Sequence, residues 1–344
     1  MRKLASIQKI ADVQPIENAD KICKYKINNW WVVDAINKYN VNDLVVYFEI
    51  DSFLPVSPNY EFLRKTSYRK LVDGTEGFRL KTISFRKQVS QGLIIPINHD
   101  IIPLNITEGE DVTDLLNIIK YEPQIPACLA GDAKGYLPLF LHKTDEERCQ
   151  TFKDDDYNNF KSLGNVFYFS EKLDGSSCSF YLKDDVFGVC SRNLDLVESP
   201  DNTFWKVARL KNIEHVLRVH AQRTEQNSIA LQGELIGEGV QGNPYKIRGH
   251  DFFLFNLYFI DSNLYASIDE LIQFSNDYHI NHVPIIAKNV PLPDSIDLCL
   301  NIAEDKSALN PNTEREGLVI RSFDRSISFK AISNKFLLKS KNDE

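Results

Sequence analysis

The sequence is organised around the stretch Phe167-Tyr-Phe-Ser-Glu-Lys172-Leu-Asp-Gly175-Ser-Ser-Cys-Ser-Phe180. An apolar, aromatic run leads to a lysine, then to the turn-forming pair Asp-Gly, and then to a second run of strand-forming residues. This order predicts a strand, a tight turn and a second strand, with Lys172 at the mouth of the hairpin. A lysine amine in that position can act as a nucleophile. The pattern Lys-x-Asp-Gly by itself also fits an exposed lysine beside a turn, so the rest of the chain has to decide.

Composition limits the classes of protein to consider. The chain has 344 residues, 43% of them hydrophobic, which is enough for two domains with packed cores. The first ten residues have no hydrophobic signal core and no apolar run is long enough to span a bilayer. We therefore expect an intracellular protein without a membrane partner, cytoplasmic by default, with the nucleus and organelles left open. The six cysteines are scattered, which favours free thiols over a zinc site or a disulfide framework. The net charge of −8 argues against non-specific nucleic-acid binding over the whole surface.

Residues 1–100 read as short strands with little helix. Runs rich in β-branched and aromatic residues are separated by polar or turn residues; they are 6–10, 24–27, 30–33, 43–50, 78–83 and 92–97. Several short strands in this length predict a small barrel, and the five-stranded oligonucleotide-binding (OB) barrel is the natural candidate.

Charge is uneven within this region. Between residues 61 and 90 there are eight Lys or Arg and three acids. Five aromatic residues are interleaved with them, namely Tyr60, Phe62, Tyr68, Phe78 and Phe85. Cations beside ring faces are what a groove that follows phosphates and stacks bases requires. A solvated loop with ordinary core aromatics is the alternative.

Residues 101–142 are irregular, with prolines at 103, 123, 126 and 138, and we expect a connection with one short amphipathic helix near 110–119. Thr144 is followed three residues later by Glu147, which is the pattern of a capping box and predicts the start of a helix. Arg148 then fits either a surface helix position or a contact with a phosphate near the entrance of a site.

From residue 167 onward strands and helices alternate, which predicts an α+β domain. After the Lys172 hairpin we expect a strand at 186–190 with a polar turn, a helix at 202–221, strands at 229–236 and 251–258 joined by a Gly-rich loop, a helix at 268–279, and strands near 315–321 and 326–332. The predicted organisation is an OB domain at 1–100, a connection at 101–142 and a catalytic domain at 143–344.

Five charged residues lie inside or at the ends of these apolar strands: Lys172, Arg192, Glu234, Glu316 and Lys330. Burying a charge is costly unless it is paired or functional, so we expect all five to converge on one pocket. The set suits transfer of a nucleotidyl group, because cations balance phosphates and acids hold a divalent metal or its water shell. Lys172 would form the covalent bond to the nucleotide. It must lose its proton to attack phosphorus, and a neighbouring cation is expected to lower its pKa.

The same residues resemble the motif series of covalent nucleotidyltransferases, the superfamily of polynucleotide ligases and mRNA capping enzymes. The series is Glu171-Lys172-Leu-Asp174-Gly175, Ser191-Arg192-Asn193, Gly233-Glu234, Phe253-Leu-Phe255, Glu316-Gly317-Leu-Val-Ile-Arg321 and Ser328-Phe-Lys330. Residues 2–10, 47–55, 90–96, 143–148 and 233–243 further resemble the RNA ligase family typified by the Deinococcus and Naegleria enzymes. That family places its OB module before the catalytic domain.

This resemblance implies an ATP-dependent RNA ligase that joins a 3′-OH to a 5′-phosphate, using ATP with Mg²⁺ or Mn²⁺. Lys172 would take AMP from ATP, pass it to a 5′-phosphate end, and the 3′-OH would then displace it. The expected substrate is a nicked RNA or RNA/DNA duplex with RNA on the 3′-OH side. The protein is expected to be a monomer.

The resemblance also implies roles for individual residues. Arg192 and Glu234 would contact the nucleotide sugar or the waters of the metal, and Phe255 would stack on adenine, unless it is ordinary core packing. Glu316 would support the metal and Lys330 would hold the α-phosphate. Asp174 would join the outer shell of the metal, and Glu171 would contact adenine through its backbone.

Two departures from the family pattern limit these assignments. Many ligases carry Lys-x-Lys in the last motif, whereas this chain has Ser328-Phe-Lys330, so Lys335 and Lys339 stay candidates for the other lysine. Ser177 stands where DNA ligases often carry arginine. A DNA ligase, a capping-type guanylyltransferase, and a catalytically inactive nucleic-acid-binding protein remain alternatives.

Overall fold

The computed structural model describes residues 3–71, 73–122, 129 and 131–339, which divide into two compact units. Unit 1 comprises residues 1–124, 148–159 and 337–344, and unit 2 comprises residues 125–147 and 160–336. The chain thus returns twice to unit 1, whereas the sequence places one unbroken catalytic domain at 143–344. None of the described helices is long and apolar enough to cross a membrane. The five described cysteines are free and buried, and Cys128 lies outside the described residues.

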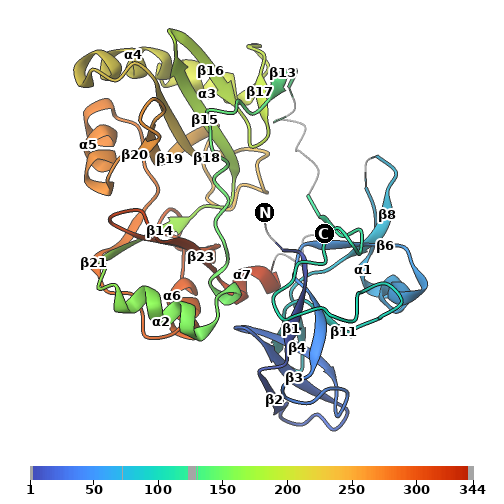
Figure 1. The fold of residues 1–344 in the computed structure, drawn as a ribbon. Helices are drawn as coiled ribbons and strands as arrows, with labels where there is room; N and C mark the ends of the chain where they lie inside the picture. The colour runs from blue at the N-terminus through green and yellow to red at the C-terminus, as the bar shows by residue number, and fades with distance from the viewer. Residues whose placement is uncertain (1–2, 72, 123–128, 130, 340–344) are drawn as a thin grey trace. The chain divides into compact units, whose positions relative to one another are not determined.

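Unit 1 is built almost entirely of short antiparallel strands (Figure 1). They form the sheets β1-β5-β11, β2-β3-β4, β12-β6-β8-β7 and β10-β9. The strands are β1 (Ala5–Lys9), β2 (Asp12–Pro15), β3 (Ile22–Ile27), β4 (Trp30–Ala35), β5 (Leu44–Phe48), β6 (Ser52–Pro55), β7 (Tyr68–Lys70), β8 (Glu76–Arg79), β9 (Ile83–Phe85), β10 (Gln88–Ser90), β11 (Leu93–Pro96) and β12 (Ile119–Lys120). The helix content is a 3-10 turn at Pro58–Leu63 and the single turn α1 (Arg64–Ser67), followed later by Cys149–Thr151 and the start of α2 (Asp154–Ser162).

The segment after residue 100 differs from the expected connection. Ile102, Val112, Leu116 and Ile118 are buried in the core cluster of unit 1 together with Val46 and other strand residues. The helix predicted near 110–119 is wrong: turns and the short strand β12 occupy this stretch. Its apolar residues therefore pack onto the strands as part of the first unit, and they do so without helical geometry.

Unit 2 contains two antiparallel sheets and several helices, which confirms the α+β class. The larger sheet has the order β13-β17-β16-β15-β18-β19-β20, and the smaller one β21-β14-β22-β23. The strands are β13 (Ala133–Tyr136), β14 (Phe167–Lys172), β15 (Ser176–Lys183), β16 (Val186–Cys190), β17 (Leu194–Leu196), β18 (Ile229–Gly237), β19 (His250–Phe259), β20 (Leu264–Tyr265), β21 (Ile285–Val290), β22 (Gly317–Ser322) and β23 (Ser328–Ile332). The helices are α3 (Thr203–Leu210), α4 (Ile213–Thr224), α5 (Ile268–Tyr278), α6 (Ile296–Ala303) and α7 (Asn334–Lys339), the last of which crosses the boundary of the two units.

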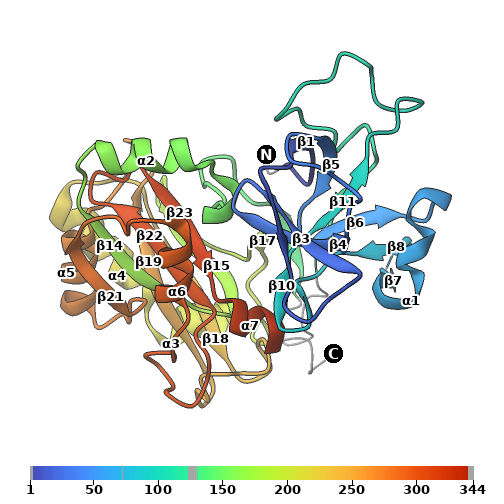
Figure 2. The same cartoon turned by 90° about the horizontal axis from the view of Figure 1, so that it is seen from below.

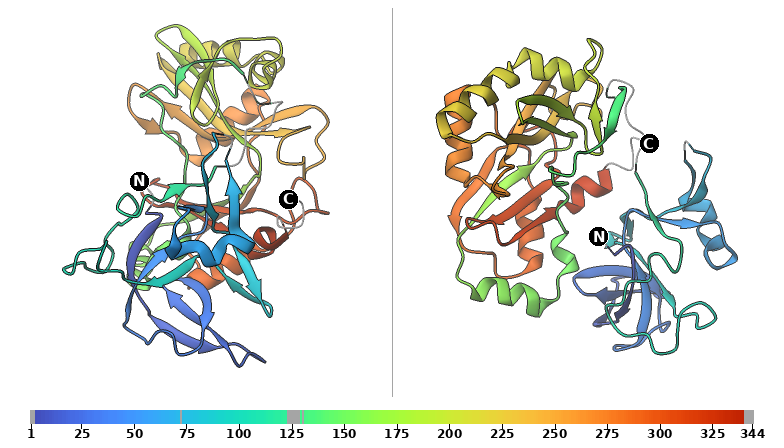
Figure 3. Two further views of the ribbon diagram at one scale, coloured as in Figure 1. Left: turned by 90° about the vertical axis from the view of Figure 1, so that its right-hand side faces the viewer. Right: turned by 45° about the horizontal axis from the view of Figure 1, so that its top comes forward.

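Three helices cover one face of the larger sheet. The yellow and orange helices α3, α4 and α5 lie on the same side of its strands (Figures 1 and 3). Apolar residues of these helices, such as Phe204, Leu217 and Phe274, join Phe180 and Leu231 of the sheet in the main core. The helix predicted at 202–221 is in fact two helices, because Asn212 adopts a left-handed conformation with φ of 53°. In the smaller sheet α6 packs along β23 (Figure 2).

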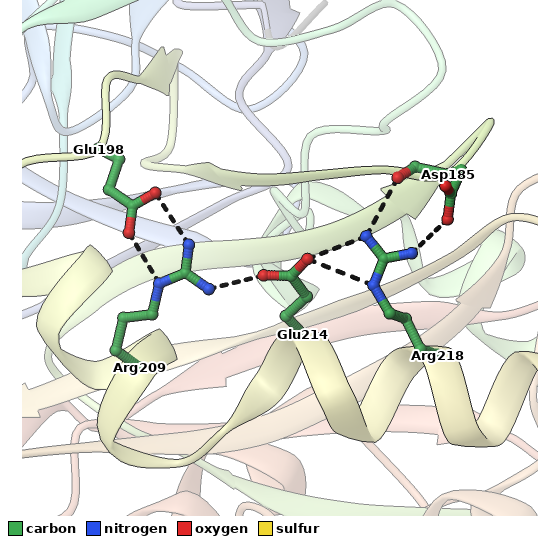
Figure 4. Close-up of polar contacts among 5 residues, drawn as sticks. All are labelled: Asp185, Glu198, Arg209, Glu214 and Arg218. Carbon is green, nitrogen blue, oxygen red and sulfur yellow. Dashed lines mark hydrogen bonds and ion pairs between the residues drawn. The ribbon is translucent and has the colours of Figure 1, made fainter.

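A chain of ion pairs joins α3 and α4 to the turn between β15 and β16 and to the segment after β17 (Figure 4). Arg209 binds both carboxylate oxygens of Glu198 and one of Glu214, and Glu214 in turn binds Arg218, which reaches Asp185. Glu214 links both arginines, and these neighbours lower its pKa.

Replacing Glu214 with glutamine is expected to lower the free energy of unfolding by at most about 1 kcal/mol, since exposed ion pairs contribute little. Urea unfolding measures this. Because the pKa of Glu214 is lowered in the folded state, its contribution should be present at neutral pH and fade as the pH falls through the acidic range. If acidification lowered the free energy of unfolding equally in the variant and the native protein, the ion pairs of Glu214 would not contribute as described.

Candidate active site

The sequence predicted a hairpin turn at Leu173–Gly175, and this prediction is wrong. The segment instead connects two different sheets. β14 pairs with β21 and β22 in the smaller sheet, whereas β15 pairs with β16 and β18 in the larger one. Lys172 lies opposite Gly317, and four residues later Ser176 lies opposite Leu235. Lys172 is therefore placed where the two sheets of unit 2 meet. The hairpin signal was misleading because a turn motif does not specify the partners of its flanking strands.

Lys172 is surrounded by carboxylates. Its Nζ donates to Glu316 and lies 2.8 Å from each oxygen of that carboxylate. Burial alone lowers the pKa of Lys172, but the charges of Glu316 and Glu234 outweigh it and raise the pKa above the ordinary value. The predicted lowering by a neighbouring cation is therefore wrong: the nearest charged groups are acids, and they hold the proton on the amine.

The same field acts on the acids. Burial, with the negative charge of Glu316, raises the pKa of Asp174 to about 7. Burial also raises the pKa of Glu234 to about 8, although Lys172 opposes the shift and the Gly175 amide donates to this carboxylate. Burial and mutual repulsion thus favour the protonated forms of Asp174 and Glu234, and a bound divalent cation would favour their ionised forms instead.

The donor set suits a hard cation, because carboxylate oxygens are the ligands that Mg²⁺ and Mn²⁺ prefer. Within the described residues no three His, Cys, Asp or Glu side chains are close enough together to ligate one ion. The residues therefore fit a metal held by one or two of Asp174, Glu234 and Glu316 and otherwise by water, as the sequence had suggested.

Lys330 shares a face of the smaller sheet with Lys172. Val319 lies opposite both Ser170 of β14 and Lys330 of β23. Because residues directly opposite one another project to the same side, Lys330 lies on the same face as Ser170 and Lys172. The strand is fixed by a hydrogen bond from the Lys330 amide to the Glu147 carbonyl at 2.7 Å. Lys335, a candidate for the second lysine, instead pairs with Glu304 at 3.2 Å.

Arg192 lies at the polar turn between β16 and β17, where both oxygens of Asp145 bind it at 2.7 Å. The neighbouring Thr144 hydroxyl is 3.5 Å from that of Ser177, which lies opposite Glu234 across the sheet. The ion pair of Arg192 is thus with Asp145, and the structure does not bring Arg192 into contact with Lys172.

The helix predicted to start at Thr144 is wrong: residues 142–147 are extended across unit 2, without regular structure. Glu146 is held by the buried Arg321 at 2.8 Å, and Thr144 is directed to Ser177. These tertiary contacts override the local capping pattern. Arg148 belongs to unit 1, where it is 9% exposed and its guanidinium is 3.3 Å from Asp51. The structure therefore excludes the surface-helix alternative for Arg148, and its phosphate contact stays a prediction.

Two further predicted residues, Phe255 and Glu171, lie near Lys172. Phe255 is partly buried and packs against the cluster that contains Leu173. Glu171 is 1% exposed; its carboxylate accepts the amide of Ala308, and its own amide donates to Pro284. Burial raises the pKa of Glu171. Only its carbonyl is thus a candidate for the predicted backbone contact with adenine.

Tyr245 is a further residue of the candidate site that no sequence pattern predicted. The Tyr245 hydroxyl accepts the backbone amide of Asp174 at 2.6 Å, and its ring packs beside Leu173. A large aromatic residue inside a Gly-rich loop was the available signal, because such a loop has few other apolar anchors.

Tyr245→Phe is expected to leave the Asp174 amide without its acceptor, at a cost of about 1–3 kcal/mol. The segment 172–175 should then be held less firmly in place. The rate of any covalent labelling of Lys172 should therefore fall while the protein stays folded. Tyr136→Phe is the control, because its side chain is 88% exposed. Equal labelling rates in the two variants would contradict a positioning role.

Gly175 has no room for a side chain. A Cβ there would lie 2.5 Å from the Leu235 carbonyl oxygen, 2.6 Å from Ile236 and 2.9 Å from Glu234. Gly175→Ala should therefore displace the segment from Glu234, destabilise the fold by about 1–3 kcal/mol and reduce covalent labelling. Gly135→Ala, with nothing within 4 Å of its Cβ, should change neither property. Thermal unfolding and labelling of both variants provide the comparison, and native-like behaviour of Gly175→Ala would contradict the packing argument.

The structure separates core aromatic residues from exposed ones in and beside the basic segment 61–90. Tyr60 and Phe78 are core residues of unit 1 and are not available for stacking on bases. Phe62 and Phe85 are exposed, and Arg64 lies over the Tyr68 ring at 4.9 Å. The segment thus combines core aromatics with a smaller exposed basic and aromatic surface.

Comparisons with known proteins agree with this geometry. An OB-fold domain family matches residues 4–97, and the RNA ligase family matches residues 165–341. Three solved structures of Naegleria gruberi RNA ligase are similar over the whole chain. A mutant with AMP and Mn shows 37% identity and a TM-score of 0.90, a mutant with ATP and Mn shows 38% and 0.89, and a structure with PPi shows 37% and 0.89. In each case 100% of both chains is covered. No curated protein sequence matches the chain.

Proposed function

Because this chain belongs to the RNA ligase family, whose fold it shares from the N-terminal OB domain to the ligase domain, we propose that it seals RNA ends with ATP through a covalent lysyl-AMP on Lys172. It is an ATP-dependent nucleotidyltransferase; the covalent intermediate and the nature of the ends are the proposal. The observation that carries it is the lysine at the junction of two sheets, with Glu316 at 2.8 Å and Glu234 and Asp174 acting on its pKa.

In the first step Lys172 Nζ attacks the α-phosphorus of ATP. A P–N bond forms, the bond from the α-phosphorus to the bridging oxygen breaks, and pyrophosphate leaves. The Glu316 carboxylate is the nearest acceptor for the proton of the amine. A divalent cation among the carboxylates would neutralise phosphate charge and oppose the field that holds this proton.

In the later steps the AMP passes to a 5′-phosphate end, and a 3′-OH attacks that end and expels AMP. Each step is an in-line displacement at phosphorus, so positioning and charge neutralisation supply most of the rate enhancement. Lys330 holds the α-phosphate, Arg192 and Glu234 contact the sugar or metal-bound water, and Phe255 stacks on adenine. Asp145 is bound by one nitrogen of the Arg192 guanidinium, which leaves its other N–H groups as donors to the sugar.

The preferred substrate is a nicked duplex, RNA or RNA/DNA, with RNA on the 3′-OH side, and the protein acts as a monomer. The exposed basic and aromatic residues of segment 61–90, such as Arg64 and Phe85, support a nucleic-acid contact in unit 1. An intracellular location is consistent with the five described free thiols.

Sealing of defined nicks tests this function. We expect joining with ATP and Mn²⁺ or Mg²⁺ when the 3′-OH strand ends in RNA, and little joining with GTP. Equal sealing of all-DNA nicks would indicate a DNA ligase, and labelling from GTP a capping-type enzyme. No adduct and no joining under any of these conditions would leave an inactive nucleic-acid-binding protein.

A further inference from the structure

The loop Gly237–Gly249, between β18 and β19, has a sharply defined course. Left-handed backbone conformations occur at Gly237, Gly239, Gln241, Gly242, Asn243, Lys246 and Gly249. The Asn243 side chain closes the loop on itself, donating to the Ile247 carbonyl at 2.8 Å and accepting the Ile247 amide at 3.0 Å. The loop is therefore a folded element with a fixed shape.

Hydrogen bonds and apolar packing connect this loop to residues 173–175. Tyr245 accepts the Asp174 amide at 2.6 Å, and Gln241 donates to the Gly175 carbonyl at 3.4 Å. Tyr245 and Ile247 both pack in the cluster that contains Leu173. Whatever binds to the loop is consequently held close to Lys172.

Two cations stand on either side of the packed Ile247. Lys246 and Arg248 are exposed, and within the described part of the chain neither has a carboxylate at ion-pair distance. Three acids lie near Lys172, namely Asp174, Glu234 and Glu316. When ionised, their carboxylates repel a polyanionic substrate. Cations fixed beside residues 173–175 offset the repulsion where the reacting strand has to approach.

We propose that Lys246 and Arg248 bind backbone phosphates of the RNA strand whose end is being joined. The inference rests on the proposed function and adds a substrate contact to it. A guanidinium binds a phosphate through two parallel hydrogen bonds, and a lysine ammonium binds it as a point charge. Neither residue takes part in transfer of AMP from ATP to Lys172.

The test uses the double variant Lys246→Asn/Arg248→Ala in the full-length protein. Asparagine is chosen at 246 because it tolerates the left-handed backbone found there. Adduct formation with ATP should stay within about twofold of the native rate, while KM for nicked RNA rises about tenfold or more with kcat nearly unchanged. The slope of log affinity against log salt should fall by about two, one for each phosphate contact.

Lys206→Ala/Arg223→Ala is the matched control, since it removes the same charge from α3 and α4. It should leave KM and the salt slope unchanged. Equal effects in both double variants, or no effect in the loop variant, would overturn the proposal while the ligase function stands. Failure of the native protein to form an adduct would refute the ligase function itself.

Discussion

Lys172→Ala is expected to abolish ATP-dependent sealing, yet to retain sealing of a nick whose 5′-phosphate already carries AMP. The first step needs the amine as nucleophile, and removing it should lower adduct formation by at least about 1,000-fold, in line with loss of a covalent catalyst. The final attack by the 3′-OH bypasses the lysine. Parallel assays on 5′-phosphate and pre-adenylylated nicks measure the two outcomes.

Two further variants make this result specific. Lys172→Met keeps the aliphatic stem and should behave like the alanine variant if only the amine is needed. Lys183→Ala removes a lysine from the far end of β15, where it pairs with Asp184 and Asp261, and should seal both substrates normally. Loss of sealing on both substrates in a folded Lys172 variant would indicate a binding or structural role for the lysine.

Glu316→Gln is expected to lower the rate of adduct formation by about 100-fold or more, because it removes a carboxylate that supports the metal and lies against the nucleophile. It should also move the pH dependence. The charge of Glu316 raises the pKa of Lys172, Asp174 and Glu234 alike. All three must lose protons for the amine to attack and the acids to hold a cation, so the native rate should rise with pH through and above neutrality.

Removing the negative charge lowers all three pKa values, so the rising part of the pH profile should shift to lower pH in the variant. Single-turnover rates of labelling between about pH 5 and about pH 10 measure the shift, since this range extends from just above the ordinary pKa of a carboxyl to that of a lysine. Glu314→Gln is the control, because Glu314 lies two residues away and pairs with Lys306. A slower variant with an unchanged profile would mean that Glu316 acts without affecting these protons.

Local patterns in the sequence predicted most of the described strands of unit 2 but only about half of those of unit 1. Alternating or continuous apolar runs give strand positions directly, and the two strands around Lys172 lie where they were expected. The sheet membership of these strands was not predictable, since the pairing of Lys172 with Gly317 joins residues far apart in the chain. For the same reason the sequence could not show that Lys172 lies where two sheets meet.

The carboxylates beside Lys172 were predictable from the sequence, but the electrostatics of the candidate site were not. Glu316 and Glu234 were expected near Lys172, and the structure brings their charges to bear on it. The sign of the shift at the lysine depends on which charge is nearest, and spacing along the chain does not contain that information. Likewise the pattern Thr144-x-x-Glu147 predicted the start of a helix. Tertiary contacts of this segment, from Thr144 to Ser177 and from Glu146 to Arg321, determine its conformation instead.

The most direct test of the central claim is to locate AMP on the native protein. After incubation with ATP and Mn²⁺, proteolysis and peptide mass spectrometry under conditions that preserve a phosphoramidate should show one modified peptide, with AMP on Lys172. AMP on another lysine, or no covalent AMP in a protein that seals nicks, would contradict the account.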